Sequence, residues 1–161
     1  MANTYTQITI QVVFAVKYRE CIIQRNHRAE LYKYMAGIIS NKNHKLLAIN
    51  GVGDHVHILF GLNPSIALSD IVRDVKNNSS RFINEKKWLP GHFEWQAGYG
   101  GFSYSRSQRP DVITYIENQE EHHKKNTFRT EYLNILNVFE IDFEEQYVFE
   151  FFNQEDQSIA L

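Results

Sequence analysis

The sequence predicts an α+β fold of the ferredoxin-like (RRM-like) class: a four-stranded sheet with two helices on one face and a further helix after the last strand. Two observations support this prediction. Hydrophobic residues recur with a period of two in some segments and with a helical period in others. The resulting elements follow the order strand, helix, strand, strand, helix, strand, which is the split βαβ arrangement. Its second sheet face is left open to the later helix.

The first strand is expected over residues 6–17, because every second position there is apolar (Ile8, Ile10, Val12, Phe14 and Val16). Gln7, Thr9 and Gln11 fall on the opposite face. Asn26 can cap a helix that extends to about residue 42. Residues 45–50 and 55–60 form the next two strands, joined as a hairpin by the turn Gly51-Val52-Gly53-Asp54.

The second helix is expected from Pro64-Ser65 to about residue 85, and the fourth strand over residues 93–104, with interruptions at its glycines. Pro110 suits the first turn of a third helix, which should extend to about residue 125. After Asn126 the pattern weakens, and the aromatic, acidic stretch 138–152 could be strand or helix.

Composition predicts one domain over residues 1–161, with residues 137–161 as an acidic, aromatic C-terminal extension. A chain of 161 residues with 43% hydrophobic residues can bury one ordinary core. It has no run of 18 apolar residues and no signal-peptide pattern at its start, so we expect a cytoplasmic protein without a membrane partner.

The net charge of −2 conceals an asymmetry. Seven acidic residues and no lysine or arginine lie between residue 138 and the end, so residues 1–137 have 17 basic and 12 acidic residues, a charge of +5. This excess permits a polyanionic partner without requiring one.

His55 and His57 lie two positions apart on the third predicted strand, so both imidazoles should point away from the helices. Paired neutral imidazoles can form half of a metal site. With seven histidines in the chain, such a pair arises by chance about 0.3 times, so it is not specific alone.

Tyr115 and Gln119 are four residues apart on the third predicted helix and should therefore share one side of it. Tyrosines beside an apolar stripe usually only pack, and this spacing is also common by chance. The combination gains weight from its context, because the helix can cover the sheet face that presents the two histidines.

In these segments the chain resembles the HUH-type single-tyrosine transposases of small bacterial insertion sequences and their REP-associated relatives. The resemblance covers most of residues 5–125. It rests on three motifs in this order: Val16-Lys17-Tyr18-Arg19, Asp54-His55-Val56-His57-Ile58-Leu59-Phe60, and Tyr115-Ile116-Glu117-Asn118-Gln119. Gly53 stands where a proline often precedes the aspartate, which affects only the local turn.

The resemblance implies a DNA transposase that cleaves and rejoins single-stranded DNA through a 5′-phosphotyrosine intermediate. Tyr115 would be the nucleophile on a C-terminal catalytic helix, and His55, His57 and Gln119 would bind a divalent metal, Mg²⁺ or Mn²⁺. The implied partners are single-stranded DNA with hairpin ends and a second subunit, in a homodimer whose active sites are shared between the subunits. The protein would then act in the nucleoid.

Arg73, Lys76 and Arg81 on the second predicted helix are candidate phosphate contacts, although a solvated helix face is an equal alternative. The aromatic residues of the fourth strand region could stack on unpaired bases or belong to the core (Trp95, Tyr99, Phe102 and Tyr104).

Two other functions fit the same sheet. One is a non-catalytic module that binds single-stranded nucleic acid through aromatic side chains on the sheet. Gln7, Thr9 and Gln11 weaken that hypothesis, because they place polar side chains on the face that should present aromatic ones. The other is a domesticated HUH nuclease. Phosphoesterases with H-x-[ST] motifs are excluded, since no histidine here precedes Ser or Thr by two positions. Initiators with two tyrosines in one helix differ because Gln119 occupies the second position.

Overall fold

The computed structural model describes residues 3–17, 23–144 and 148, and it contains a four-stranded antiparallel sheet of strand order β2-β3-β1-β4. The strands are β1 (Thr9–Ala15), β2 (Lys45–Val52), β3 (His55–Gly61) and β4 (Gly100–Tyr104). This order and the element sequence confirm the ferredoxin-like prediction. Tyr18, Arg19 and part of the stretch 138–152 (residues 145–147 and 149–152) lie outside the described residues.

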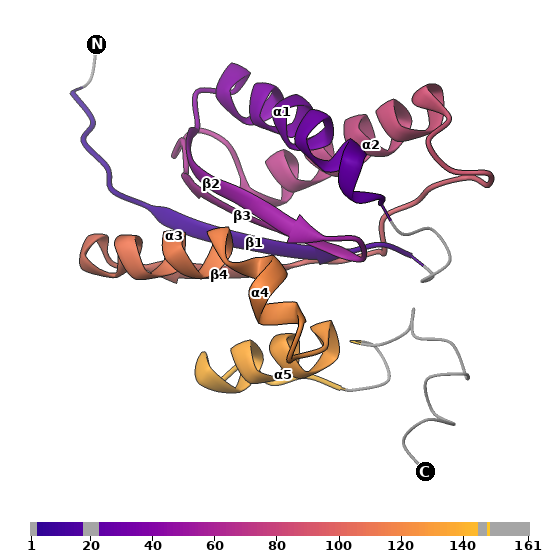
Figure 1. Ribbon diagram of the computed structural model, residues 1–161. Helices are drawn as coiled ribbons and strands as arrows, with labels where there is room; N and C mark the ends of the chain where they lie inside the picture. The colour runs from indigo at the N-terminus through magenta and orange to yellow at the C-terminus, as the bar shows by residue number, and fades with distance from the viewer. Residues whose placement is uncertain (1–2, 18–22, 145–147, 149–161) are drawn as a thin grey trace.

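Two helices cover one face of the sheet, α1 (Arg25–Asn41) and α2 (Leu68–Lys86) (Figure 1). Their helical-period residues pack on the alternate residues of β1 and β3, and together they form the main core (among them Val12, Phe14, Leu31, Met35, Ile58, Ile71 and Val75). Both helices begin at a different residue from the predicted one. Gln24 and Ala67 precede them, and neither makes a side-chain cap.

The second sheet face, which the sequence left open to one later helix, is covered by several. After the short turn η2 (Arg106–Gln108), three helices lie across it: α3 (Arg109–Glu117), α4 (Gln119–His123) and α5 (Phe128–Val138) (Figure 1). Phe128 and Leu136 of α5 pack with Val13 and Phe102 of the sheet. As a result Thr9 and Gln11, which were expected on the open face, are each only 1% exposed.

The single third helix predicted to about residue 125 is divided into α3 and α4 at Asn118, whose φ of −94° and ψ of 19° are not helical. The Asn50 side-chain amide donates to the carbonyl oxygens of Ile116 (3.1 Å) and Glu117 (3.0 Å). These contacts from β2 satisfy carbonyl groups at the end of α3. The break therefore places Gln119 at the start of a new helix.

The fourth strand is shorter than predicted. Of the predicted strand residues 93–99, only Trp95 pairs with the sheet, through an isolated bridge to Val16. Gly98 has a φ of +84°, a left-handed conformation that glycine adopts without strain and that interrupts an extended strand. None of the described helices combines the length and apolar composition needed to cross a bilayer.

Candidate metal and nucleophile site

His55 and His57 lie on β3, a central strand between β2 and β1, and both point to the face covered by α3, α4 and α5. They are 1% and 0% exposed. The preceding hairpin needs glycine at position 51, because a Cβ there would overlap the carbonyl oxygen of His55. The prediction that both imidazoles share one face is confirmed.

His55 bonds at both ring nitrogens. Nδ1–H donates to Asp54 Oδ1 (2.7 Å), and Nε2 lies 3.1 Å from Gln119 Oε1 and 3.2 Å from Glu131 Oε1. The Phe128 ring stacks on the imidazole at 4.3 Å between centroids. Burial acts to lower the pKa of His55, but hydrogen bonds and charges of Asp54 and Glu131 outweigh it and raise the pKa to about 9.

His57 differs from its neighbour in charge. The Gln11 amide donates to its Nδ1 (2.9 Å), so Nε2–H donates to Glu131 Oε1 (2.9 Å). Gln11 is itself oriented by Tyr104, whose hydroxyl donates to Gln11 Oε1 (2.6 Å). Complete burial lowers the pKa of His57 to about 4, despite the proximity of Glu131. The ring is therefore neutral near pH 7.

Glu131, on α5, lies at the centre of the site, and the sequence analysis did not identify it. Oε1 lies 2.9 Å from His57 Nε2, 3.1 Å from His123 Nε2 and 3.2 Å from His55 Nε2. Burial would raise the pKa of Glu131, but these histidines outweigh it and hold the pKa far below its ordinary value. A buried carboxylate is thus kept ionised by imidazole donors.

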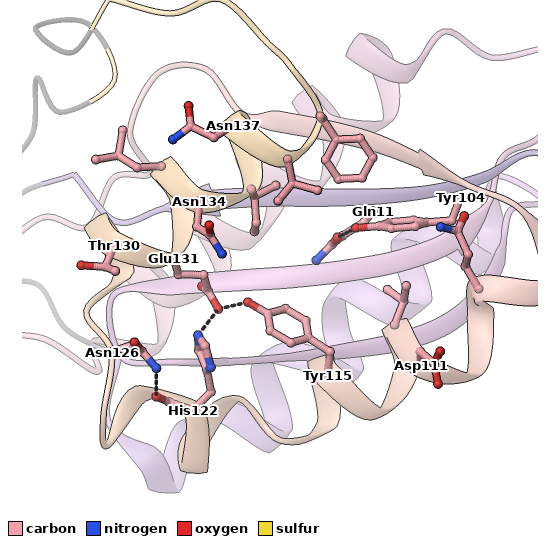
Figure 2. A pocket seen from close by; sticks show the side chains of 16 residues that line it. Gln11, Tyr104, Asp111, Tyr115, His122, Asn126, Thr130, Glu131, Asn134 and Asn137 are labelled. Atoms are coloured by element: carbon pink, nitrogen blue, oxygen red, sulfur yellow. Dashed lines mark hydrogen bonds and ion pairs between the residues drawn. The ribbon is translucent and has the colours of Figure 1, made fainter.

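The second carboxylate oxygen of Glu131 faces the predicted nucleophile. The Tyr115 hydroxyl donates to Oε2, and Gln119 Nε2 donates to the same atom at 3.1 Å. His122 Nε2 lies 3.2 Å from it (Figure 2). Burial and the negative charge of Glu131 raise the pKa of Tyr115, so its hydroxyl is protonated at neutral pH.

The structure thus brings Tyr115, Gln119, His55 and His57 together, as the sequence predicted. Gln119 is fully buried, and the Tyr115 ring meets the His57 ring edge-on at 5.8 Å. Glu131 was missed because the apolar pattern after Asn126 is weak. The available signal was its position three residues after Phe128 and five before Leu136, both of which are buried on α5.

Two groups of side chains at this site could hold a metal ion: His55, His57 and Glu131, and His122, His123 and Glu131. In an octahedral site with bonds of about 2.1 Å, adjacent ligand atoms lie about 3.0 Å apart. Three separations are close to this spacing: 3.1 Å between His55 Nε2 and Gln119 Oε1, 2.9 Å between His57 Nε2 and Glu131 Oε1, and 3.2 Å between His55 Nε2 and Glu131 Oε1. The donors present fit one divalent ion.

A cavity of about 850 Å³ opens beside Tyr115 and Glu131, between α3 and α5 (Figure 2). Its floor includes Gln11 and Tyr104 from the sheet. Tyr115 is therefore accessible from one side, whereas the two imidazoles are buried.

The three predicted phosphate contacts lie on α2, across the sheet from Tyr115 (Figure 1). Arg73 pairs with Asp70 and Asp74, and Arg81 donates to Asn78 at 2.5 Å.

Lys76 is half-buried, and its Nζ donates to the carbonyl oxygens of Gln96 (2.6 Å) and Gly98 (2.8 Å). Burial lowers its pKa. Of the aromatic residues, Trp95 and Phe102 belong to the core, and Tyr99 is 38% exposed.

Comparison with known proteins gives one consistent result. The family model for IS200-like transposases matches residues 4–119. The ISDra2 transposase TnpA of Deinococcus radiodurans is 25% identical over 122 residues, which cover 71% of this chain and 86% of that protein. The crystal structure of a Deinococcus radiodurans protein described as a transposase aligns with this chain at a TM-score of 0.58 and 25% identity. The alignment covers 74% of this chain and 96% of that protein.

A second solved structure, of a REP-associated tyrosine transposase bound to a REP hairpin, also has a TM-score of 0.58. The two chains are 13% identical, and their alignment covers 76% of this chain and 73% of the relative. This likeness therefore concerns the fold alone. Glu131 and all of α5 lie beyond the residues that the family model matches.

Proposed function

Because this chain belongs to the IS200-like, HUH-type single-tyrosine transposases and is accordingly a DNA transposase, we propose that Tyr115 is its nucleophile and that His55, His57 and Gln119 bind a divalent ion. The observation that supports this most strongly is the convergence on Glu131. One of its oxygens meets both imidazoles, and the other accepts the Tyr115 hydroxyl.

The ion is proposed to be Mg²⁺ or Mn²⁺, with Glu131 adding a carboxylate ligand to the two imidazoles and the amide. Asp54 fixes His55 with Nδ1 protonated, which leaves Nε2 available for a metal. His57 needs the same tautomer. Rotating the Gln11 amide by 180° would let His57 Nδ1–H donate to it, and Tyr104 would then accept from Gln11.

A bound ion would polarise the scissile phosphate and offset the charge that develops on its oxygens. Tyr115 would supply the attacking oxygen and lose its proton. The bond from that oxygen to phosphorus forms while the bond from phosphorus to the 3′ oxygen breaks, and the 3′ oxygen gains a proton to become a free hydroxyl. The phosphotyrosine retains the energy of the broken diester, so a second 3′ hydroxyl can reverse the attack and join new ends without ATP.

The proposed substrate is single-stranded DNA with an imperfect hairpin at the recognised end. The relative solved with a REP hairpin supports this substrate class. Arg73 and Arg81 remain proposed phosphate contacts. Lys76 is a third, provided that its ammonium group exchanges its hydrogen bonds to two backbone carbonyl oxygens for a phosphate. A location in the nucleoid follows from such a substrate.

We retain the homodimer as a proposed assembly. One chain already brings its own Tyr115 and Gln119 to its own His55 and His57. From this geometry we propose that each subunit builds its own site, in place of the shared sites that the resemblance implies.

The test is cleavage of oligonucleotides that cover the DNA flanking the gene. We expect cleavage with Mg²⁺ or Mn²⁺, none in EDTA, and none of the same sequence as a duplex. The double variant His55→Ala/His57→Ala should lose Mn²⁺ affinity, measured by calorimetry, whereas His92→Ala, an exposed histidine outside the site, should keep it. Full cleavage in EDTA, or unchanged affinity in the double variant, would contradict the metal role.

A further inference from the structure

The cavity beside Tyr115 is a second feature of the site, and it borders the proposed ion site at Glu131. Tyr115 and Glu131 line it, whereas neither His55 nor His57 does. It therefore lies on the Tyr115 side of the site, away from the two imidazoles. Its volume of about 850 Å³ falls within the range of small-molecule sites.

The walls of this cavity are chemically suited to a neutral, planar group. Lysine and arginine are absent from its described lining, and Asp111 and Glu131 supply acidic groups, which disfavour a phosphate. Neutral side chains that can donate and accept hydrogen bonds surround the space (Gln11, Gln108, Asn126, Thr130, Asn134 and Asn137). The Tyr104 and Phe139 rings, 5.5 Å apart between centroids, offer aromatic surface.

Asn134 is the clearest candidate for a recognition group. It lies one turn along α5 from Glu131, and Figure 2 shows its side-chain amide near Glu131. Within the described part of the chain, this exposed amide has no hydrogen-bond partner. Amide groups match the donor and acceptor edges of nucleobases.

We propose that this cavity binds the unstacked base of the nucleotide that keeps the 5′ phosphate, the one directly 3′ of the cleaved bond. The inference rests on the proposed function of Tyr115. In an in-line displacement, the leaving 3′ oxygen departs from the side opposite the attacking tyrosine oxygen. The nucleotide on the leaving side is therefore directed away from the cavity, and the one joined to Tyr115 stays beside it.

This assignment gives a physical reason for the choice of single strands. A base inside a duplex is stacked and paired, so it would have to leave the helix before it could enter the cavity. In an unpaired strand that cost is much smaller, and stacking on aromatic surface and hydrogen bonds from amides would be gained.

The experiment uses the full chain and the single-stranded DNA cut from the gene's own flanks. An abasic residue is placed either directly 3′ or directly 5′ of the cleaved bond, and formation of the covalent adduct is measured at limiting DNA. We expect the 3′ abasic strand to react on the order of tenfold more slowly than the intact strand. The 5′ abasic strand should react nearly as fast as the intact one.

A variant then connects the base to the protein. Asn134→Leu should slow the reaction of the intact strand but cause no further loss on the 3′ abasic strand, because the interaction is already missing. Asn41→Leu, at an exposed asparagine that ends α1 on the other side of the sheet, is the control and should match the unaltered protein on both strands.

Equal rates for intact and 3′ abasic strands would overturn the base subsite, as would an equal loss on both strands in Asn134→Leu. In both cases the adduct would still form, so the role of Tyr115 would stand. Absence of an adduct with every strand would instead overturn the proposed function together with the subsite.

Discussion

At the scale of single residues, the site depends on two histidines on β3 that are separated by one residue and differ in charge, one imidazole being positive and the other neutral. His55 is held charged by Asp54 and Glu131, and His57 is held neutral by burial. Both contact the same ionised carboxylate. The metal-free protein therefore contains a buried charged cluster whose stability should depend on pH.

The first prediction is that the metal-free protein is most stable near pH 6.5. The stabilisation from His55 is complete below its ordinary pKa of 6.5 and is lost as pH rises through about 9. His57 binds a proton more readily when unfolded, so stability also falls as pH drops from 6.5 towards 4. Because the pKa of Glu131 is depressed, its ionised carboxylate stabilises the fold fully above the ordinary carboxyl pKa of 4.5. This stabilisation decreases as pH falls below 4.5.

Urea unfolding in EDTA across this range measures the effect. Each limb should change the free energy of unfolding by a few kcal/mol, at about 1.4 kcal/mol per pKa unit. Glu131→Gln, which removes a charge that raises the pKa of His55, should move the alkaline limb to lower pH. A flat profile, or an alkaline limb unaltered in this variant, would contradict the assigned charges.

The residue types and spacings predicted His55, His57, Tyr115 and Gln119, because the members of each pair are close in the chain: the histidines share β3, and only the single residue Asn118 separates α3 from α4. Glu131 could not be found in this way. Its role depends on α5 folding back across the sheet, and that contact joins residues 74 positions apart in the chain. Local periodicity holds no information about such a contact.

At the scale of elements, the junction between α3 and α4 determines how the Tyr115 hydroxyl and the Gln119 amide are oriented. Tyr115 lies before the break at Asn118, and Gln119 lies after it. The sequence predicted one continuous helix because residues 110–125 have no proline or glycine after the first turn. At the break, the Asn50 amide of β2 donates to the last carbonyl oxygens of α3, a tertiary contact that no property of the helix sequence reveals.

The second prediction concerns this junction. Asn50→Ala removes two hydrogen bonds to the end of α3 and should lower the free energy of unfolding by about 1 to 3 kcal/mol. It should also weaken Mn²⁺ binding, since Gln119 loses its fixed position. Chemical unfolding and calorimetry measure the two effects, with Asn41→Ala as the exposed control. Unchanged values for both would show that Asn50 does not hold the junction.

The strands were predicted better than the later helices, for a reason visible in their packing. Apolar alternation on β1 and β3 follows directly from burial against α1 and α2. The opposite face mixes Thr9, Gln11 and the histidines with apolar residues, so its additional burial under α5 was not apparent. Polar side chains there satisfy one another across the layer, which only the folded chain shows.

At the scale of the whole molecule, the distribution of the site over one chain or two is open to a direct test. Sheet, tyrosine helix and α5 of one chain complete the arrangement by themselves. The third prediction is therefore that mixed dimers of Tyr115→Phe and His57→Ala subunits remain inactive, because neither chain retains a whole site. Restored cleavage, with the adduct only on the His57→Ala chain, would establish sites shared between subunits.

The central claim is that Tyr115 becomes covalently joined to a 5′ phosphate of single-stranded DNA. The most direct measurement is mass spectrometry of the protein after incubation with the flanking single strand and Mn²⁺, followed by peptide mapping of the adduct. The account predicts a DNA adduct on the peptide that contains Tyr115, absent in EDTA and absent from a folded Tyr115→Phe variant. An adduct on Tyr115→Phe, or cleavage by the unaltered protein without any adduct, would contradict it.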